Sequence, residues 1–346
     1  ENLTAVMNGL KKGTLHPKPL RRAYVPKSPT KLRPLGIPAV RDRVAQEVLR
    51  RLLEPIFEPL FHNSSFGFRA GRNCHMAINA VIAMHKKGRR VVLDADIKGF
   101  FDAIPHKVIM QALTAQVADG NILRLVDKFL KAGVMENGVF KPTTIGTPQG
   151  GVISPLLANI VLNHLDWQLH AEGYSFARYA DDFVVVCKTW QQAEEAWVLV
   201  RRVLNEDLNL QLNKAKTKIT TYGKGYQFLG FNLSSRSRRM RPTSVKKFKD
   251  KIKQLTVRKY NFDQEVIKDV NRVIRGTGNF FATDFSTNRW LFQKLDSWIR
   301  MRLRCMKYKR KWRSDNWKFR RRLFRKLGLL SLEQFLPGPM IPRWGK

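Results

Sequence analysis

Two stretches of sequence, VVLDADIKGFFD (91–102) and FARYADDFVVVC (176–187), decide the fold of this 346-residue chain. Both contain short apolar runs of the residue types that favour β-strands. Asp96 ends the run of the first stretch, and Asp181 and Asp182 stand at the turn between the two β runs of the second. We therefore expect three carboxylates at the ends of neighbouring strands.

Two acidic residues in one tight turn repel each other unless water or a shared cation screens them. A third acid from a neighbouring strand would complete an all-oxygen site suited to Mg²⁺. Two Mg²⁺ ions about 3.5–4 Å apart can activate a hydroxyl and stabilise a leaving oxygen, which is the chemistry of nucleotidyl transfer. A solvated hairpin turn is the alternative. Spacing also leaves Asp94, on the same strand face as Asp96, and Asp102 open as ligands.

The charge of the chain indicates its class of partner. It carries 64 Lys and Arg against 27 Asp and Glu, a net charge of +37. From residue 236 onward there are 32 basic and 8 acidic residues, or +24 in 111 residues. Such a chain needs a polyanion, and nucleic acid fits better than a membrane surface. No run of about 18 apolar residues occurs that could span a membrane.

Apolar spacing predicts the secondary structure around these stretches. Two β runs around Lys27 predict a hairpin, and Val44, Val48, Leu52 and Ile56 recur at helical spacing up to Pro59. Further helices are expected over 73–86, 107–132, 154–169, 190–208, 244–256, 263–281 and 286–313, and a β run over 226–233. The polar stretch 234–239 is the expected boundary between a catalytic body and a basic helical region.

Seven motifs occur in a fixed order along the chain. They are RPLGIP (33–38), SFGFRAGR (65–72), DIKGFFD (96–102), GTPQGGVISPLLANI (146–160), YADD (179–182), LNLQLNKAKTKI (208–219) and FLGF (228–231). Together they resemble the reverse transcriptases of group II introns. The resemblance covers about residues 10–233, and the region 244–313 is similar to the helical thumb of that family.

The resemblance implies an α+β right-hand polymerase whose palm is built on an antiparallel sheet. The implied domains are fingers (1–92), palm (93–235), a helical, maturase-specific thumb (236–313) and a basic DNA-binding segment (314–346). Because the chain starts at Glu1 without an initiator Met, we expect upstream sequence to be missing, and PGPMIPRWGK is typical of either a truncated or a trailing end. Residues 311–346 contain no His/Cys nuclease cluster, so protein-catalysed DNA cleavage is not expected.

The resemblance also assigns metal-binding roles. Asp96, Asp181 and Asp182 match the catalytic carboxylates, and the Ile97 carbonyl faces a metal, so two Mg²⁺ ions are the implied cofactors. Lys216 matches a lysine that protonates pyrophosphate, although the family more often has Glu where this chain has Ala215.

The substrate-binding roles follow in the same way. Lys27 and Arg33 match the cations that hold the dNTP triphosphate, and their neighbours Lys31 and Arg21 are alternatives. Phe101 matches the ring that excludes a ribose 2′-hydroxyl. The alternatives are that Phe100 has this role, or that Phe101 is an ordinary core residue. Gln149 matches an amide at the nucleotide. The primer grip matches Phe228, Leu229, Gly230 and Phe231.

In the basic tail, Trp312, Trp317 and Phe319 alternate with Arg and Lys, a pattern that suits single-stranded nucleic acid as well as a basic helix with core aromatics. The implied function is an RNA-directed DNA polymerase that also binds structured intron RNA and assists its splicing. Its partners would be intron RNA, target DNA, an RNA template with a DNA primer, and dNTPs, in bacterial cytoplasm or an organelle. The alternatives are a splicing factor with a vestigial polymerase and a domesticated relative acting in defence or repair.

Overall fold

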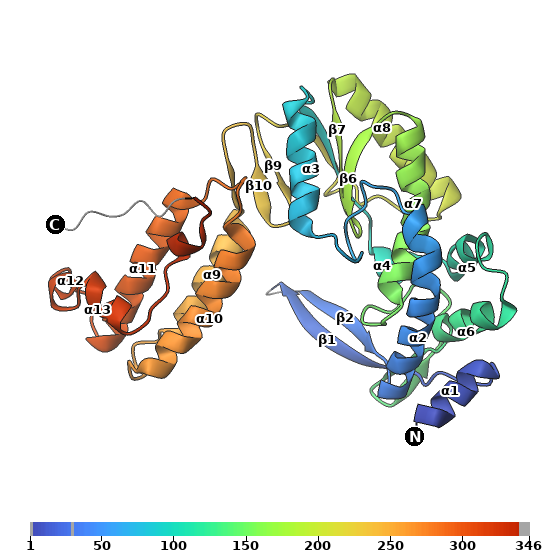
Figure 1. Cartoon of the computed structure of the whole chain (residues 1–346), viewed down its shortest axis with the longest axis horizontal. Helices are drawn as coiled ribbons and strands as arrows, with labels where there is room; N and C mark the ends of the chain where they lie inside the picture. Colours follow the sequence, from blue (N-terminus) through green and yellow to red (C-terminus); the bar gives the residue numbers. More distant parts are fainter. Residues whose placement is uncertain (1–2, 29–30, 339–346) are drawn as a thin grey trace. The chain divides into compact units, whose positions relative to one another are not determined.

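The computed structural model describes residues 3–28 and 31–338, without the side chains of Lys27, Ser28 and Lys31. It is an α+β protein that divides into two compact units, one up to Thr221 and one from Tyr222 (Figure 1). The division falls before the expected polar boundary at 234–239, because Ser234 and Ser237 lie in the turn of a hairpin and hydrogen-bond to each other across it. The two units are described separately below.

A four-stranded antiparallel sheet forms the centre of the first unit. Its strand order is β6 (Ser175–Tyr179), β7 (Asp182–Cys187), β3 (Val91–Asp96) and β8 (Lys218–Thr221). The antiparallel sheet expected for a palm is therefore confirmed. One face of β3 and β7, with Leu93, Phe183 and Val185, belongs to the main apolar core.

Helices cover this sheet. Buried residues of α7 (Ser154–Ala171) and α8 (Trp190–Arg202) join the core that contains the strand residues. α3 (Cys74–Lys86) packs against β6 and β7 and buries Ile78 and Val81. A π-helical segment, Val203–Asp207, ends α8. The helices expected over 73–86, 154–169 and 190–208 are thus confirmed.

A second sheet of the first unit has the order β2 (Lys31–Ile37), β1 (Leu20–Ser28), β4 (Val134–Glu136) and β5 (Val139–Lys141). β1 and β2 form the expected hairpin, with Arg21 opposite Ile37 and Val25 opposite Arg33. β1 pairs with β4 in parallel at Leu20 and Arg21, so the hairpin is fixed at its base.

The helix expected after this hairpin is confirmed, and three of its four regularly spaced apolar residues are exposed. α2 (Val40–Phe57) is present, but Val44, Leu52 and Ile56 are exposed and the buried positions include Leu49 and Leu53. The helix carries two apolar stripes, and periodicity alone does not say which one meets the core. Helix α1 (Leu3–Lys11) precedes the hairpin and contacts α2.

The single helix expected over 107–132 is two helices, α5 (His106–Thr114) and α6 (Gly120–Leu130). Asp119 starts the second one, because its carboxylate accepts hydrogen bonds from the backbone nitrogens of Asn121 (2.7 Å) and Ile122 (3.2 Å). An N-cap of this kind satisfies backbone donors that a continuous helix would not expose. A short helix, α4 (Phe100–Ala103), follows β3.

The second unit begins with a small antiparallel sheet of β9 (Tyr226–Phe228), β10 (Phe231–Leu233) and β11 (Arg238–Met240). Helices α9 (Pro242–Leu255), α10 (Gln264–Phe281) and α11 (Arg289–Lys307) follow, close to the expected positions. α11 ends at Lys307 rather than at 313. The short elements α12 (Asp315–Lys318), α13 (Arg321–Lys326) and a 3₁₀ turn at Leu332–Phe335 come next, and the last packs on α10 and α11.

Candidate active site

The strand register brings the three predicted carboxylates to one edge of the central sheet. Asp96, the last residue of β3, lies directly opposite Asp182, the first residue of β7. Directly opposed residues of antiparallel strands project from the same face. Asp181 is the second residue of the two-residue turn that joins β6 to β7. Tyr179 and Asp182, which flank this turn, pair with each other. Ala180 completes this turn in a left-handed conformation, with φ of 59°.

Asp96 is held by two side chains of the loop after α8. The Asn213 amide nitrogen donates to Oδ2 (2.9 Å), and the Lys216 ammonium donates to Oδ1 (3.0 Å) and Oδ2 (2.9 Å). The loop is anchored to β3, because the Asn213 backbone nitrogen donates to the Asp96 carbonyl oxygen at 2.8 Å. Its helical turn places Asn213 and Lys216 three residues apart on one side. The structure thus places Lys216 on Asp96, one of the three predicted metal-binding carboxylates.

Two acids at this edge, Asp181 and Asp94, have raised pKa values. Burial raises the pKa of Asp181, and the charge of Asp96 raises it further, while Arg33 and Lys216 act in the opposite direction. Burial also raises the pKa of Asp94 to about 6, against the influence of Lys218. Carboxylates that are desolvated beside another carboxylate favour protonation or a bound cation. By chemical type, these carboxylate oxygens are ligands that suit a divalent metal ion such as Mg²⁺.

A buried ion pair between Arg178 and Asp166 supports the turn of Ala180 and Asp181. The guanidinium of Arg178 donates through Nε to Asp166 Oδ1 (2.8 Å) and through Nη1 to Asn159 Oδ1 (2.9 Å) and the Ala180 carbonyl (3.0 Å). Both side chains of the pair are 1% exposed. A charged, fully buried group that donates to the turn backbone fixes the residue preceding Asp181.

The segment 64–69 supports the same turn from its side. Its backbone pairs with Arg178, since Arg178 donates to the Ser64 carbonyl and Phe66 donates to the Arg178 carbonyl, both at 2.8 Å. Gly67 packs so tightly that a Cβ there would lie 2.3 Å from the Ala180 nitrogen. Glycine is therefore required by the close approach of two backbones.

The loop 146–151, which is rich in Gly and Pro, contacts both β2 and the helical segment after β3. Gly36 donates its backbone N–H to the Gln149 carbonyl (2.9 Å), and the Gln149 amide donates to Asp102 Oδ2 (2.9 Å). A Cβ at Gly150 would lie 2.9 Å from the Gly36 oxygen, so the two backbones approach closely here. The loop is thus held in one conformation, with Gln149 tied to Asp102.

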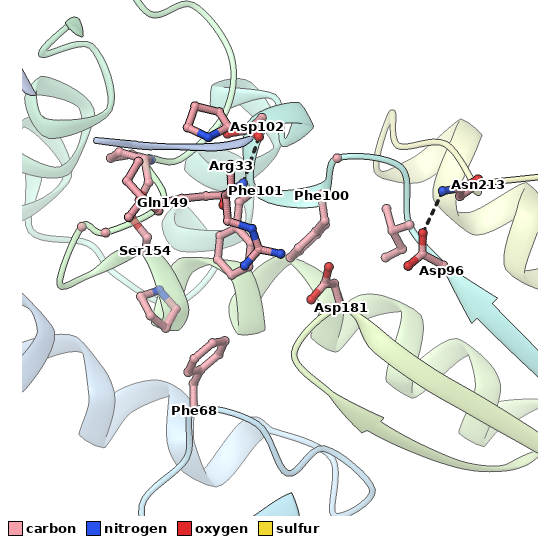
Figure 2. Close-up of a pocket in the computed structure, with 18 of the residues that line it drawn as sticks. Arg33, Phe68, Asp96, Phe100, Phe101, Asp102, Gln149, Ser154, Asp181 and Asn213 are labelled. Carbon is pink, nitrogen blue, oxygen red and sulfur yellow. Dashed lines mark hydrogen bonds between the residues drawn. The ribbon is translucent and has the colours of Figure 1, made fainter. Parts of the chain in front are cut away.

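A cavity of about 620 Å³ opens over these groups, and its lining comes from the first unit alone. Figure 2 shows Asp96 and Asp181 at one side, Gln149 and Ser154 at the other, and Arg33 between them. Phe101 and its competitor Phe100 both line the cavity, but Phe101 is half-buried and Phe100 is 2% exposed. Phe68 lines it from below. The volume and lining suit a nucleotide with its phosphates.

Some predicted site residues are not placed at this cavity. The side chain of Lys27 lies outside the described residues, although its backbone belongs to β1. The four residues of FLGF form a tight hairpin turn in the second unit, with Leu229 (φ 45°) and Gly230 (φ 88°) at its centre and Phe228 paired with Phe231. Two central residues with positive φ are typical of the turn that matches strand twist.

The register places Asp96, Asp181 and Asp182 at one edge of the sheet, but within residues 3–28 and 31–338 no three His, Cys, Asp or Glu side chains, these included, lie close enough to form a metal-ligand group. In the same part of the chain, no helix has the length and hydropathy that a membrane crossing requires. The aromatic residues of the tail divide into two classes. Trp312 and Trp317 are 63% and 75% exposed, and Phe319 is 8% exposed among other aromatic rings.

Several residues of the site were not singled out from the sequence. Asn213 lies within a quoted motif, three positions before Lys216, but an amide there has no charge to mark it. Arg178, Asp166 and Asn159 form one buried network, and a sequence gives no sign that they meet. Phe68 lies in SFGFRAGR, one of the seven motifs of the resemblance, but the resemblance assigned no role to the residues of this motif.

The chain is similar to known families in two consecutive segments. Residues 25–233 match the family model for reverse transcriptase (RNA-dependent DNA polymerase), and residues 245–327 match the maturase-specific domain of group II introns. The second match continues past residue 313, into the segment expected to be a separate DNA-binding part.

The chain is also similar to individual proteins. The chain is 38% identical to protein YkfC of Escherichia coli over 67% of this chain and 71% of YkfC. It is 31% identical to the group II intron-encoded protein LtrA of Lactococcus lactis over 74% of this chain, which spans about half (53%) of LtrA. Among solved structures, apo telomerase from Candida tropicalis has a TM-score of 0.52 at 12% identity, covering 83% of this chain and 62% of that chain. At that identity the likeness concerns the fold.

Proposed function

Because the chain belongs to the reverse transcriptase (RNA-dependent DNA polymerase) family and continues into a group II intron maturase-specific domain, we propose that it copies an intron RNA into DNA. In the reaction the primer 3′-hydroxyl attacks the α-phosphate of a dNTP and pyrophosphate leaves. The observation that carries the proposal is the register that places Asp96 opposite Asp182, with Asp181 in the adjoining turn at the edge of a nucleotide-sized cavity.

Asp96, Asp181 and Asp182 would hold two Mg²⁺ ions together with the Ile97 carbonyl. The fit rests on the oxygen donors and on the pKa of Asp181, which the neighbouring carboxylate of Asp96 helps to raise. The chemistry that bound Mg²⁺ supplies is activation of the primer hydroxyl and neutralisation of charge on the leaving pyrophosphate. Asp96 would have to exchange the ammonium of Lys216 for its metal, and Lys216 would then be free to donate a proton to pyrophosphate.

The cavity wall supplies the dNTP contacts. Arg33 would bind the triphosphate with its planar guanidinium, which can make paired hydrogen bonds to phosphate oxygens, and Lys27 would add a point charge. Phe101 would lie under the sugar and exclude a 2′-hydroxyl, which favours dNTPs over rNTPs by steric exclusion. Gln149 would contact the nucleotide from the opposite wall, where Asp102 orients its amide.

The second unit would hold the nucleic acids. The hairpin turn formed by Phe228, Leu229, Gly230 and Phe231 would act as the primer grip. The +24 charge from residue 236 onward would bind the template–primer duplex, structured intron RNA and target DNA through their phosphates. In the domain scheme that we propose, fingers are 1–92, palm 93–235, thumb 236–313 and a DNA-binding segment 314–346. Splicing assistance in bacterial cytoplasm or an organelle belongs to the same proposal.

Primer extension on an RNA template with Mg²⁺ and dNTPs tests the polymerase. The wild-type chain would be compared with Asp181→Ala/Asp182→Ala and with Glu194→Ala/Glu195→Ala, an adjacent acidic pair exposed on α8. We expect extension by the wild type and the α8 control, none by the catalytic variant, and equal salt-sensitive RNA binding by all three. RNA binding without extension by any of them would instead favour a splicing factor with a vestigial polymerase.

A further inference from the structure

Phe68 has a backbone conformation that a bulky side chain rarely adopts. Its φ is 58°, in the left-handed region, and its side chain is 51% exposed. A left-handed conformation is uncommon for residues other than Gly, Asn and Asp, and an aromatic residue there is an outlier. Strained residues of this kind persist where the surrounding structure imposes the conformation, and they cluster at functional sites.

The residues on both sides of Phe68 explain how the conformation is imposed. The Gly67 carbonyl accepts a hydrogen bond from the buried Asn159 amide (2.8 Å), and Gly67 packs against the backbone of Ala180. Arg69 is buried and donates to the carbonyls of His62 (2.8 Å) and Ser65 (2.9 Å) and to the Glu58 carboxylate (2.9 Å). The chain is therefore fixed before and after Phe68, while nothing in these contacts requires an aromatic ring.

The ring itself is directed at the nucleotide cavity. Phe68 belongs to the cavity lining, and Figure 2 shows it pointing upward from its loop toward Arg33 and Asp181. Its centroid is 6.4 Å from that of Phe101, with the two planes at 80°. An exposed aromatic face inside a nucleotide-sized cavity is a surface on which a base can stack.

We propose that Phe68 is a base-stacking residue that positions the base pair being formed. The inference rests on the proposed polymerase function and extends it, since Phe101 would contact the sugar and Arg33 the phosphates, leaving the base without a partner of its own. The close packing of Gly67 on Ala180 fixes the distance between this ring and the turn that carries Asp181. Phe68 thereby aligns the base relative to the catalytic carboxylates.

The test compares Phe68→Asn, Phe68→Leu and Phe68→Tyr in single-nucleotide incorporation. Asn tolerates the left-handed conformation, so that variant keeps the loop and removes the ring. Leu keeps apolar bulk without an aromatic face, and Tyr keeps the face. Loss of one base–aromatic stack corresponds to a rise in the dNTP KM of about 5- to 160-fold. We expect this rise for Asn and Leu, a value near wild type for Tyr, and unchanged unfolding temperature for Asn.

Repeating the incorporation assay on a template that lacks the base at the templating position identifies the base on which Phe68 stacks. If the difference between wild type and Phe68→Asn disappears on this template, Phe68 stacks on the template base, and if it persists, Phe68 stacks on the incoming base. A wild-type dNTP KM in both Phe68→Asn and Phe68→Leu would overturn the inference while leaving the polymerase intact. Failure of the wild type to extend would overturn the proposed function instead, so the two failures are distinguishable.

Discussion

Replacing Asp166 by Asn removes the charge that balances Arg178 while keeping the shape of the side chain. Both members of this pair are 1% exposed, so water cannot replace the lost carboxylate. Breaking a buried ion pair by removing one partner destabilises a protein by about 3–5 kcal/mol. For a unit of this size that corresponds to a fall in unfolding temperature of about 6–20 °C. We also expect slower primer extension, because Arg178 donates to the Ala180 carbonyl beside Asp181.

The measurement is thermal unfolding of Asp166→Asn beside Asp127→Asn, which breaks an exposed ion pair with Lys131 in the same unit. Exposed pairs contribute about 0–1 kcal/mol, so the control should unfold within a few degrees of wild type. The double variant Asp166→Leu/Arg178→Met removes both charges and should recover much of the stability, since apolar replacement of a buried pair is often neutral. Equal unfolding temperatures for Asp166→Asn and Asp127→Asn would refute the reasoning.

Three further predictions concern other parts of the chain. Burial lowers the pKa of His62, so its contribution to stability is present above the ordinary histidine pKa of about 6.5 and is lost as pH falls below it. The unfolding temperature measured between pH 7.5 and 5 should therefore fall less steeply towards acid for His62→Gln than for wild type. The control variant His16→Gln, at an exposed site, should leave this pH dependence unchanged. Trp312→Ala should weaken single-stranded RNA binding at constant unfolding temperature, whereas Phe319→Ala should destabilise the fold by about 3–5 kcal/mol; the opposite pattern would show that Trp312 is the structural residue. Gly67→Ala should slow extension more than tenfold, because its Cβ would lie 2.3 Å from the backbone nitrogen of Ala180, in the turn that carries Asp181, and wild-type extension by this variant would show that the two loops separate freely.

The sequence was sufficient for the strands and for the acids at their ends, because local patterns determine both. VVLDAD predicts β3 and the position of Asp96, and YADD predicts the hairpin turn. The pairing of Asp96 with Asp182 spans more than 80 residues, and no local pattern encodes it. The order of seven motifs supplied that information, since it connects the chain to a family whose fold brings them together.

The parts that were missed depend on contacts between distant segments. Asn213 is an ordinary loop amide until the register of β3 and β8 brings its loop to Asp96. The division of 107–132 into two helices depends on the Asp119 cap, which is a local signal and could have been read from the Asp-Gly step. On α2 the local pattern supports either of two apolar stripes, and tertiary packing selects the one that includes Leu49 and Leu53.

The turn of Ala180 and Asp181 and the loop that carries Phe68 share one support, which explains why both can hold left-handed residues that are not glycine. Asn159 donates to the Gly67 carbonyl and accepts from Arg178, and Arg178 in turn donates to the Ala180 carbonyl. A single buried network thus fixes the backbone next to Asp181 and next to Phe68. Catalysis by positioning depends on such pre-formed geometry, because errors of about 1 Å at the reacting atoms cost large factors in rate. We therefore expect substitutions at Asn159, which lines no part of the cavity, to impair nucleotide incorporation as severely as substitutions in its wall.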